Sequence, residues 1–472
     1  MTRKLLTVLY CLCPYLGAFA QQNMTLYQMH DITQSNFLNP SVAGDCKWNV
    51  GLPALGNVSV AAEIPLAYND LGAGKEYMDG NKILSTVRKT NLVSANISVN
   101  ILTLGYRTGD MYLQFTMNEK ISSKLSVSKN FFELFLSGNA PYAGKTLETN
   151  FALSVSHYRE YGFNMAYDVG NDLWLGARAK LLFGRIGADS KNNVLSLYTD
   201  PATYALELNS DLLVNASVPG TVKTDPLDGT VNGFDADFEV SRFLVNPVNI
   251  GGAIDLGLNK VFENGLKVSA SILNIGMINW SSNTHQFYQK STLKYSGATS
   301  GINNWDDLAD TLRSVINFKS AGGEAFSQWL TPEVMAGISY PVMDYIRAGI
   351  TGYAGISSAG IPWALTATAL TDNTSHVFGS LSYTVANNSF VNIGAGIGVR
   401  FGAFNLHAIT DNILAIFNPA AQRYATVQFG INFKFGCGDG EVKSKRYKSI
   451  PCPSFGRQSK GLTSSVPCSS GK

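Results

Sequence analysis

Long apolar runs and charged side chains are both scarce in this chain of 472 residues. After the first twenty residues, no uninterrupted apolar run approaches the ~20 residues that a membrane-spanning helix needs. The sequence therefore excludes an ordinary helical membrane protein. Only 15% of the residues are charged, whereas the chain has 45 Gly, 25 Phe and 21 Tyr. This composition is typical of a wall with one apolar face and one polar face.

Motifs for catalysis and metal binding are also missing from the sequence. None of the histidines stands in a metal-ligand spacing, and no nucleophile elbow accompanies them. The series Gly394, Gly396 and Gly398 lacks the strand-to-helix context of a phosphate loop. We therefore expect a protein that is not an enzyme and needs no cofactor and no metal. The histidines are His30, His157, His285, His376 and His407.

The first twenty residues have the three parts of a secretory signal. Arg3 and Lys4 precede an apolar stretch, which ends in Ala18-Phe19-Ala20. A membrane-anchoring helix is the alternative, but the stretch is shorter than a spanning helix. We expect cleavage after Ala20 (signal peptide 1–20) and export to the outer membrane.

Alternation of apolar and polar residues is the strongest pattern in the chain, and it is clearest in Met111–Asn118. Period two indicates a strand with one dry face and one wet face. Such strands recur to residue 436, often joined by tight turns such as Arg107–Asp110. Only a closed barrel satisfies all the backbone hydrogen bonds of strands in lipid. The sequence predicts an all-β, transmembrane antiparallel β-barrel of about 14 strands over residues 51–436.

The two faces of these strands can be assigned from the sequence. Arg178 and Lys180 lie opposite the leucines of their strand, which predicts that they face the lumen. The run from Phe151 to Val169 exceeds one membrane crossing, so we expect a rim or bulge at His157–Glu160. The last strand carries Phe429, Ile431, Phe433 and Phe435 on one side, as the closing strand of an outer-membrane barrel does.

Three segments break the alternation. Residues 21–50 are expected to form an N-terminal plug-like segment in the lumen or a lead-in on the inner rim. Residues 285–330 are expected to form an external insertion with a helix at 304–312. Residues 437–472 form a basic tail with net charge +5. This tail is either a disordered, solvated periplasmic end or a contact for an acidic partner or the cell wall.

Two sets of candidate site residues follow from side-chain chemistry. Four cysteines remain after signal cleavage, and in an oxidising periplasm they allow three disulfide connectivities. One hypothesis joins the two cysteines that barrel closure brings together, Cys46 and Cys437, and leaves Cys452 with Cys468. His157, Arg159 and Glu160 form a charged cluster at the rim or in the lumen, either as a functional polar site or as a salt-linked rim.

Several sequence stretches carry a resemblance to a known group of proteins. Thr25–His30, Gln34–Pro40 and Gly51–Leu55 resemble the start of an uncharacterised family of outer-membrane barrels close to the PorP/SprF proteins of type IX secretion and gliding. Further similar stretches are His157–Tyr161, Ile275–Trp280 and Asp411–Pro419. Asn39-Pro40 is also similar to FadL-type transporters, whose N-terminus forms a plug. The resemblance implies an outer-membrane barrel and carries over no activity.

Three functional hypotheses remain. The first is a structural or accessory subunit of a cell-envelope secretion or gliding machinery. Its partners would be outer-membrane lipid and envelope proteins, or the cell wall through the basic tail, with no nucleic acid. The second is a passive channel or a FadL-like transporter for small or hydrophobic molecules, with residues 21–50 as its plug. The third, an outer-membrane hydrolase, has almost no support from the residues.

Overall fold

The computed structural model describes residues 23–71, 79–227, 229–236, 248–295, 318–356, 361–371, 376–386 and 389–437. Three expected features lie outside these residues. They are the signal peptide at 1–20, the helix at 304–312, and the pair Cys452 and Cys468 in the basic tail. Among the described residues, no helix is long and apolar enough to cross a membrane.

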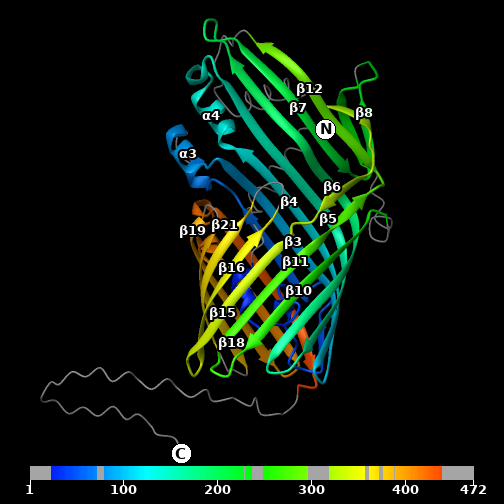
Figure 1. The fold of residues 1–472 in the computed structure, drawn as a ribbon, viewed down its shortest axis with the longest axis vertical. Helices are drawn as coiled ribbons and strands as arrows, with labels where there is room; N and C mark the ends of the chain where they lie inside the picture. Colours follow the sequence, from blue (N-terminus) through cyan, green and yellow to red (C-terminus); the bar gives the residue numbers. More distant parts are fainter. Residues whose placement is uncertain are drawn as a thin grey trace, which may run out of the picture.

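Sixteen strands form one closed antiparallel ring (Figure 1). The ring closes because β1 and β2 pair with β3 on one side and with the last strand, β21, on the other. In chain order the ring strands are β1 (Trp48–Gly51), β2 (Asn57–Glu63), β3 (Thr90–Thr108), β4 (Met111–Ser128), β5 (Thr146–Asp168), β6 (Leu173–Thr199), β10 (Ile250–Val261), β11 (Lys267–Trp280), β14 (Phe326–Trp329), β15 (Glu333–Met343), β16 (Ile346–Gly355), β17 (Trp363–Thr371), β18 (Val377–Ala386), β19 (Ser389–Phe401), β20 (Phe404–Thr410) and β21 (Tyr424–Phe435).

The strand count is 16, so the expected count of about 14 is wrong. Two positions in the ring are each shared by two consecutive strands, and one of these strands, β14, lies within residues 285–330, which were expected to form an external insertion. A turn at residues 52–56 separates β1 from β2, and it contains Pro53, which has no N–H, and Ala54, whose φ is 60°. Residues 330–332 likewise separate β14 from β15, and both of these strands pair with β11.

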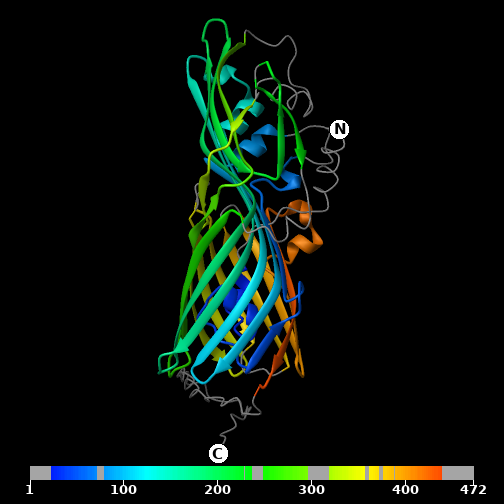
Figure 2. The same ribbon diagram turned by 90° about the vertical axis from the view of Figure 1, so that its right-hand side faces the viewer.

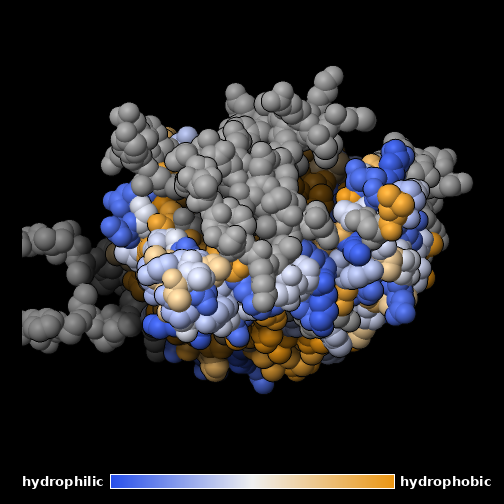
Figure 3. Space-filling model, turned by 90° about the horizontal axis from the view of Figure 1, so that it is seen from above, coloured by the Kyte–Doolittle hydropathy of each residue, from blue (hydrophilic) through white to orange (hydrophobic). Residues whose placement is uncertain are grey.

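The two faces of the wall follow the predicted alternation. Gly394, Gly396 and Gly398 face inward on β19, whereas Ile393 and Ile397 are exposed. Apolar side chains gather on the flank of the barrel when it is viewed from above (Figure 3). This apolar outer surface suits hydrocarbon. It includes Phe163, Met165, Leu181, Ile254, Ile272, Ile338, Ile350, Leu365, Leu381, Leu406, Val427 and Phe429.

Part of the wall continues past the ring as a curved sheet (Figure 2). The lower half of β6 pairs with β10, and its upper half pairs with β7 (Leu206–Ser217). β12 (Thr284–Tyr295) pairs with all of β7 and then with β13 (Lys319–Gly322). We call this upper sheet the extension. The predicted irregularity near His157 is confirmed, because the β5–β6 register shifts between His157 and Tyr158.

Short helices and one hairpin accompany the extension. Between β2 and β3 the chain forms η2 (Tyr68–Leu71) and α3 (Gly80–Thr86). α3 contacts α4 (Lys129–Ser137), and Ile83 of α3 is buried in a small apolar cluster that includes Phe132 of α4. The remaining elements are η3 (Ala140–Tyr142), the hairpin β8 (Gly220–Thr224) and β9 (Val231–Ala236), α7 (Leu414–Phe417) and η4 (Pro419–Ala421).

Trp280 joins the extension to the barrel. Its ring is fully buried against β6, at the point where that strand changes partner. A Cβ at Gly184 or Gly187 would lie only 2.5 or 2.4 Å from this ring, so the close approach requires glycine at both positions. The indole N–H donates to Gln328, whose amide in turn donates to β5 and β6. These contacts pack the upper end of the barrel.

A disulfide joins Cys46, just before β1, to Cys437, just after β21. The bond fastens the first strand to the last across 391 residues of chain. It therefore reinforces the seam where the ring closes.

Apolar contact with lipid can be tested by placing a charge on the outer face. Phe163→Arg should destabilise the folded barrel in bilayers by about 2–4 kcal/mol, because a buried guanidinium is costly near the bilayer midplane. Leu227→Arg, at a nearly fully exposed position beyond the ring, should change stability by less than about 0.5 kcal/mol. Urea unfolding in vesicles measures both. Equal, small effects would show that Phe163 does not face lipid.

Loss of the seam disulfide should lower stability. The double variant Cys46→Ala/Cys437→Ala should lose about 2–4 kcal/mol, because the unfolded chain gains freedom when the cross-link is removed. The gel-shift temperature of the unreduced barrel reports the change. Cys452→Ala/Cys468→Ala is the matched control, and an equal drop in that variant would contradict a special role for the seam.

Candidate functional site: the barrel lumen

Residues 23–45 lie inside the barrel, and we call them the luminal segment (Figure 2). The segment contains α2 (Met24–Tyr27) and η1 (Thr33–Phe37), and most of its side chains are buried. Its apolar residues pack against inward-facing residues such as Met335 and Phe378. Its polar groups bond to the wall on all sides, through Asn164 (β5), Arg178 (β6), Leu258 (β10), Ser271 (β11), Thr351 (β16), Ser382 (β18) and Asn432 (β21).

Asp411 holds the start of the luminal segment. Its buried carboxylate accepts the backbone N–H groups of Met24 (3.1 Å) and Thr25 (2.8 Å). These groups belong to the first turn of α2, where a helix leaves its N–H groups unpaired. The Tyr424 hydroxyl donates to the same carboxylate. Asp411 follows β20, so the wall itself supplies this anchor.

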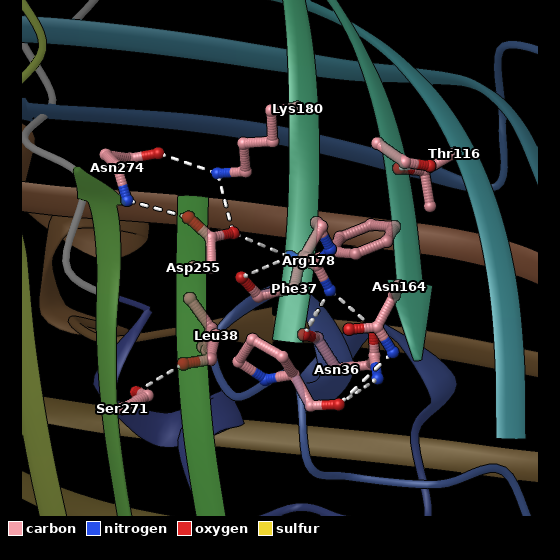
Figure 4. A network of polar contacts seen from close by, with 12 residues as sticks. Asn36, Phe37, Leu38, Thr116, Asn164, Arg178, Lys180, Asp255, Ser271 and Asn274 are labelled. Atoms are coloured by element: carbon pink, nitrogen blue, oxygen red, sulfur yellow. Dashed lines mark hydrogen bonds and ion pairs between the residues drawn. The ribbon is translucent and has the colours of Figure 1, made fainter. Parts of the chain in front are cut away.

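Arg178 holds the middle of the luminal segment, at Asn36 and Phe37 (Figure 4). Its guanidinium donates to the backbone oxygen of Asn36 at 2.6 Å and to that of Phe37 at 3.4 Å. It also pairs with Asp255 at 3.1 Å, directly across the β6–β10 ladder. A guanidinium suits this position because it can donate to several acceptors at once.

Asp255 connects this anchor to further charges. Lys180 pairs with Asp255 at 2.7 Å and with Glu160 at 3.5 Å, and Lys120 pairs with Glu160 at 2.9 Å. The Asn274 backbone N–H also donates to Asp255. Buried charges are costly unless paired, and each charge of this network has an opposite charge within 4 Å. The network makes the lumen polar, and its three cations and two anions give it a net charge of +1.

The Asn39-Pro40 turn lies against two wall glycines. A Cβ on Gly176 would be 2.2 Å from the Pro40 carbonyl carbon, and a Cβ on Gly257 would be 2.1 Å from the Asn39 side-chain oxygen. Only glycine therefore lets the wall approach this turn. Sequence reasoning missed this use of the two glycines, since nothing local marks them.

A polar cavity of about 90 Å³ lies between the luminal segment and residues 328–333. Its lining comes from the luminal segment, from inward-facing residues of β2 to β6, and from β11, β14 and β15. It is smaller than the ~150 Å³ apolar cavity that holds benzene in an engineered protein. Its size and polarity suit water or a small polar solute.

The structure divides the cluster expected at His157, Arg159 and Glu160. His157 and Arg159 lie on one face, where both contact Glu119 at 2.8 and 2.7 Å. Glu160 points to the opposite face, into the lumen. Adjacent strand residues face opposite sides, so these three side chains cannot form one site. This corrects the expected single cluster.

The structure brings together two of the four candidate cysteines, Cys46 and Cys437. Asp255 and Asp411 were not among the expected site residues. The sequence does carry a signal for Asp255. This acid stands between Ile254 and Leu256, so in an alternating strand whose apolar residues face lipid it must face the lumen. Within the described ranges, no three His, Cys, Asp or Glu side chains could hold a metal ion together.

These features define a closed β-barrel with an apolar outer surface and a lumen occupied by its own N-terminal segment. The chain belongs to a family of unknown function, DUF5723, whose model matches residues 40–411. This agrees with the resemblance to an uncharacterised family and gives no link to PorP/SprF proteins in particular. No curated protein matches the chain.

Several solved outer-membrane proteins are distantly similar to the chain. A Pseudomonas aeruginosa FadL homologue shares 9% identity at a TM-score of 0.40, covering 89% of this chain and 100% of its own. The Pseudomonas putida toluene transporter TodX shares 10% sequence identity at a TM-score of 0.34, and the match covers 85% of this chain and 92% of TodX. The translocator domain of the autotransporter NalP from Neisseria meningitidis shares 9% sequence identity at a TM-score of 0.27, and the match covers 82% of this chain and 88% of that domain. Values this low carry no functional argument.

Removal of the Arg178 side chain should loosen the luminal segment. Arg178→Met should cost about 3 kcal/mol, because it leaves Asp255 short of one partner and removes the bonds to Asn36 and Phe37. It should also speed protease cleavage within residues 23–45. Lys290→Met, which removes an exposed ion pair with Asp211, should change stability by less than about 1 kcal/mol. Equal cleavage rates in the two variants would contradict the anchoring role of Arg178.

Proposed function

We propose that this protein is a passive outer-membrane channel for small polar solutes, kept closed by its luminal segment. The supporting observation is that this segment lies in a largely polar lumen and is joined to the wall by many hydrogen bonds and by one apolar cluster, with no covalent link between residues 23–45 and the wall. Hydrogen bonds can be exchanged for bonds to water at a small net cost, about 1 kcal/mol each. The segment can therefore move while the wall stays intact.

The outer membrane is the compartment that suits this barrel. Its outer face is apolar, and its strands leave no free edge along most of the ring. The polar lumen favours polar solutes over the hydrophobic molecules that a FadL-like transporter would carry. No catalytic step is part of the proposal.

An accessory role in an envelope secretion or gliding machinery is the second proposal. The extension supports it, because β5, β6, β7 and β12 carry the sheet well beyond the ring and offer a surface for other proteins. The basic tail would add a contact with an acidic partner or the cell wall. In this role the barrel would conduct no solute.

A reversible lock on the luminal segment tests the channel. An ideal Cβ at Gly394 lies 2.4 Å from the Thr25 hydroxyl oxygen and 2.2 Å from that of Ser382. Thr25→Cys/Gly394→Cys, combined with Ser382→Ala to make room for the new Cβ, therefore places two thiols within disulfide reach. Liposome swelling should show solute flux for the reduced variant and at least tenfold less for the oxidised one. The reductant is also applied to the wild type, because it attacks the native disulfide.

The matched control pair joins two wall strands without touching the luminal segment. Thr366 and Thr384 face each other across β17 and β18, with their hydroxyl oxygens 2.8 Å apart. Oxidation of Thr366→Cys/Thr384→Cys should leave the flux unchanged. Folded protein that passes no solute in any redox state would reject the channel and favour the accessory subunit. Equal solute flux through the oxidised and the reduced lock variant would show that the luminal segment does not gate the channel.

A further inference from the structure

The charges around the luminal cavity are of two kinds. Lys120, Glu160, Arg178 and Lys180 all line it and all belong to the ion-pair network. Lys124 and Glu333 line the same cavity and have no ion-pair partner within 4 Å among the described residues. These two residues carry opposite charges and come from two different strands, β4 and β15.

Lys124 has bonding capacity to spare. An ammonium group has three donors, and among the described residues this one makes a single hydrogen bond, to the hydroxyl of Thr331. Lys124 occupies the inward-facing series of β4, together with Asn118, Lys120 and Ser122. Its remaining donors are therefore available to whatever occupies the cavity.

The Glu333 carboxylate, in contrast to Lys124, has no hydrogen-bond partner in the part of the chain that the structure describes. It stands two residues after Thr331, on the inward face at the start of β15. Lys124 bonds to Thr331, two residues before Glu333, and both charged side chains line the same cavity. No ion pair within 4 Å joins them among the described residues, so an occupant of the cavity can contact both.

An occupant that compensates both charges must itself carry two opposite charges. An anion would neutralise Lys124 and repel Glu333, and a cation would do the reverse. A neutral solute would leave both charges uncompensated, at the cost that accompanies unpaired buried charge. The volume of about 90 Å³ admits only a compact molecule.

We propose that this cavity binds a small zwitterion with its carboxylate on Lys124 and its ammonium group on Glu333. Compact α-amino acids such as glycine have this chemistry. The idea that this zwitterion is the solute of the channel rests on the proposed function. Its binding to the cavity can be measured without any measurement of flux.

Calorimetric titration of the folded, full-length protein in detergent tests the site with three probes. Glycine should bind, whereas acetate and methylammonium, which each carry one of its charges, should bind at least about tenfold more weakly. Lys124→Met and Glu333→Gln should each weaken glycine binding at least about tenfold. Lys290→Met should leave it unchanged, since Lys290 lies outside this cavity.

A charge exchange separates a binding role from a structural one. Lys124→Glu/Glu333→Lys preserves both charges in reversed positions, and glycine can bind in the opposite orientation, so affinity should recover relative to the single variants. Acetate binding as tight as glycine binding, or no glycine binding by folded wild type, would overturn the proposal. If the single variants fail to fold, the affinities of the wild type for glycine, acetate and methylammonium still test whether the cavity requires both charges of the ligand. Flux gated by the lock but no glycine binding would reject this site and leave the channel intact.

Discussion

Closure of the strand ladder is the constraint on which this structure depends. In hydrocarbon an unpaired backbone N–H or C=O has no water to bond, so the wall must return to its first strand. β1 and β2 meet this requirement together, because both pair with β21 and both pair with β3. The disulfide at the same seam adds a covalent link between the strands that meet there.

A closed wall of this kind creates an interior that must be filled. Side chains alternate, so a wall with an apolar outside has inward-facing residues that are small or polar. The luminal segment fills this interior with matched polar groups, and Asp411 holds its start while Arg178 holds its middle. Filling the lumen with a separate segment, rather than with larger wall side chains, leaves the interior capable of rearrangement.

Much of this fold could be predicted from the sequence, since period two is a local signal. The antiparallel barrel that the alternation predicts is confirmed, and so is the inward direction of Arg178 and Lys180. Interruptions were harder to see. The turn at residues 52–56 separates two strands of the same alternation, and a single pattern there suggests one strand.

The site was less predictable, because it is built from distant parts of the chain. Arg178 meets Asp255 and Asn36 across separations of 77 and 142 residues, and no local pattern encodes such meetings. The cluster of His157, Arg159 and Glu160 shows the opposite error. Neighbours in sequence were expected to act together, and the pleat of the strand sends them to opposite faces.

Three strands that line the lumen continue upward toward the extension. β4 carries Lys120 and Lys124 at the cavity and runs on to Ser128, and β5 and β6 likewise run on past the ring as single strands, with register shifts along the way. The same backbone therefore serves both regions. A protein or surface that grips the extension therefore pulls on the same backbone that positions the luminal charges, so mechanical load outside the barrel reaches its interior directly.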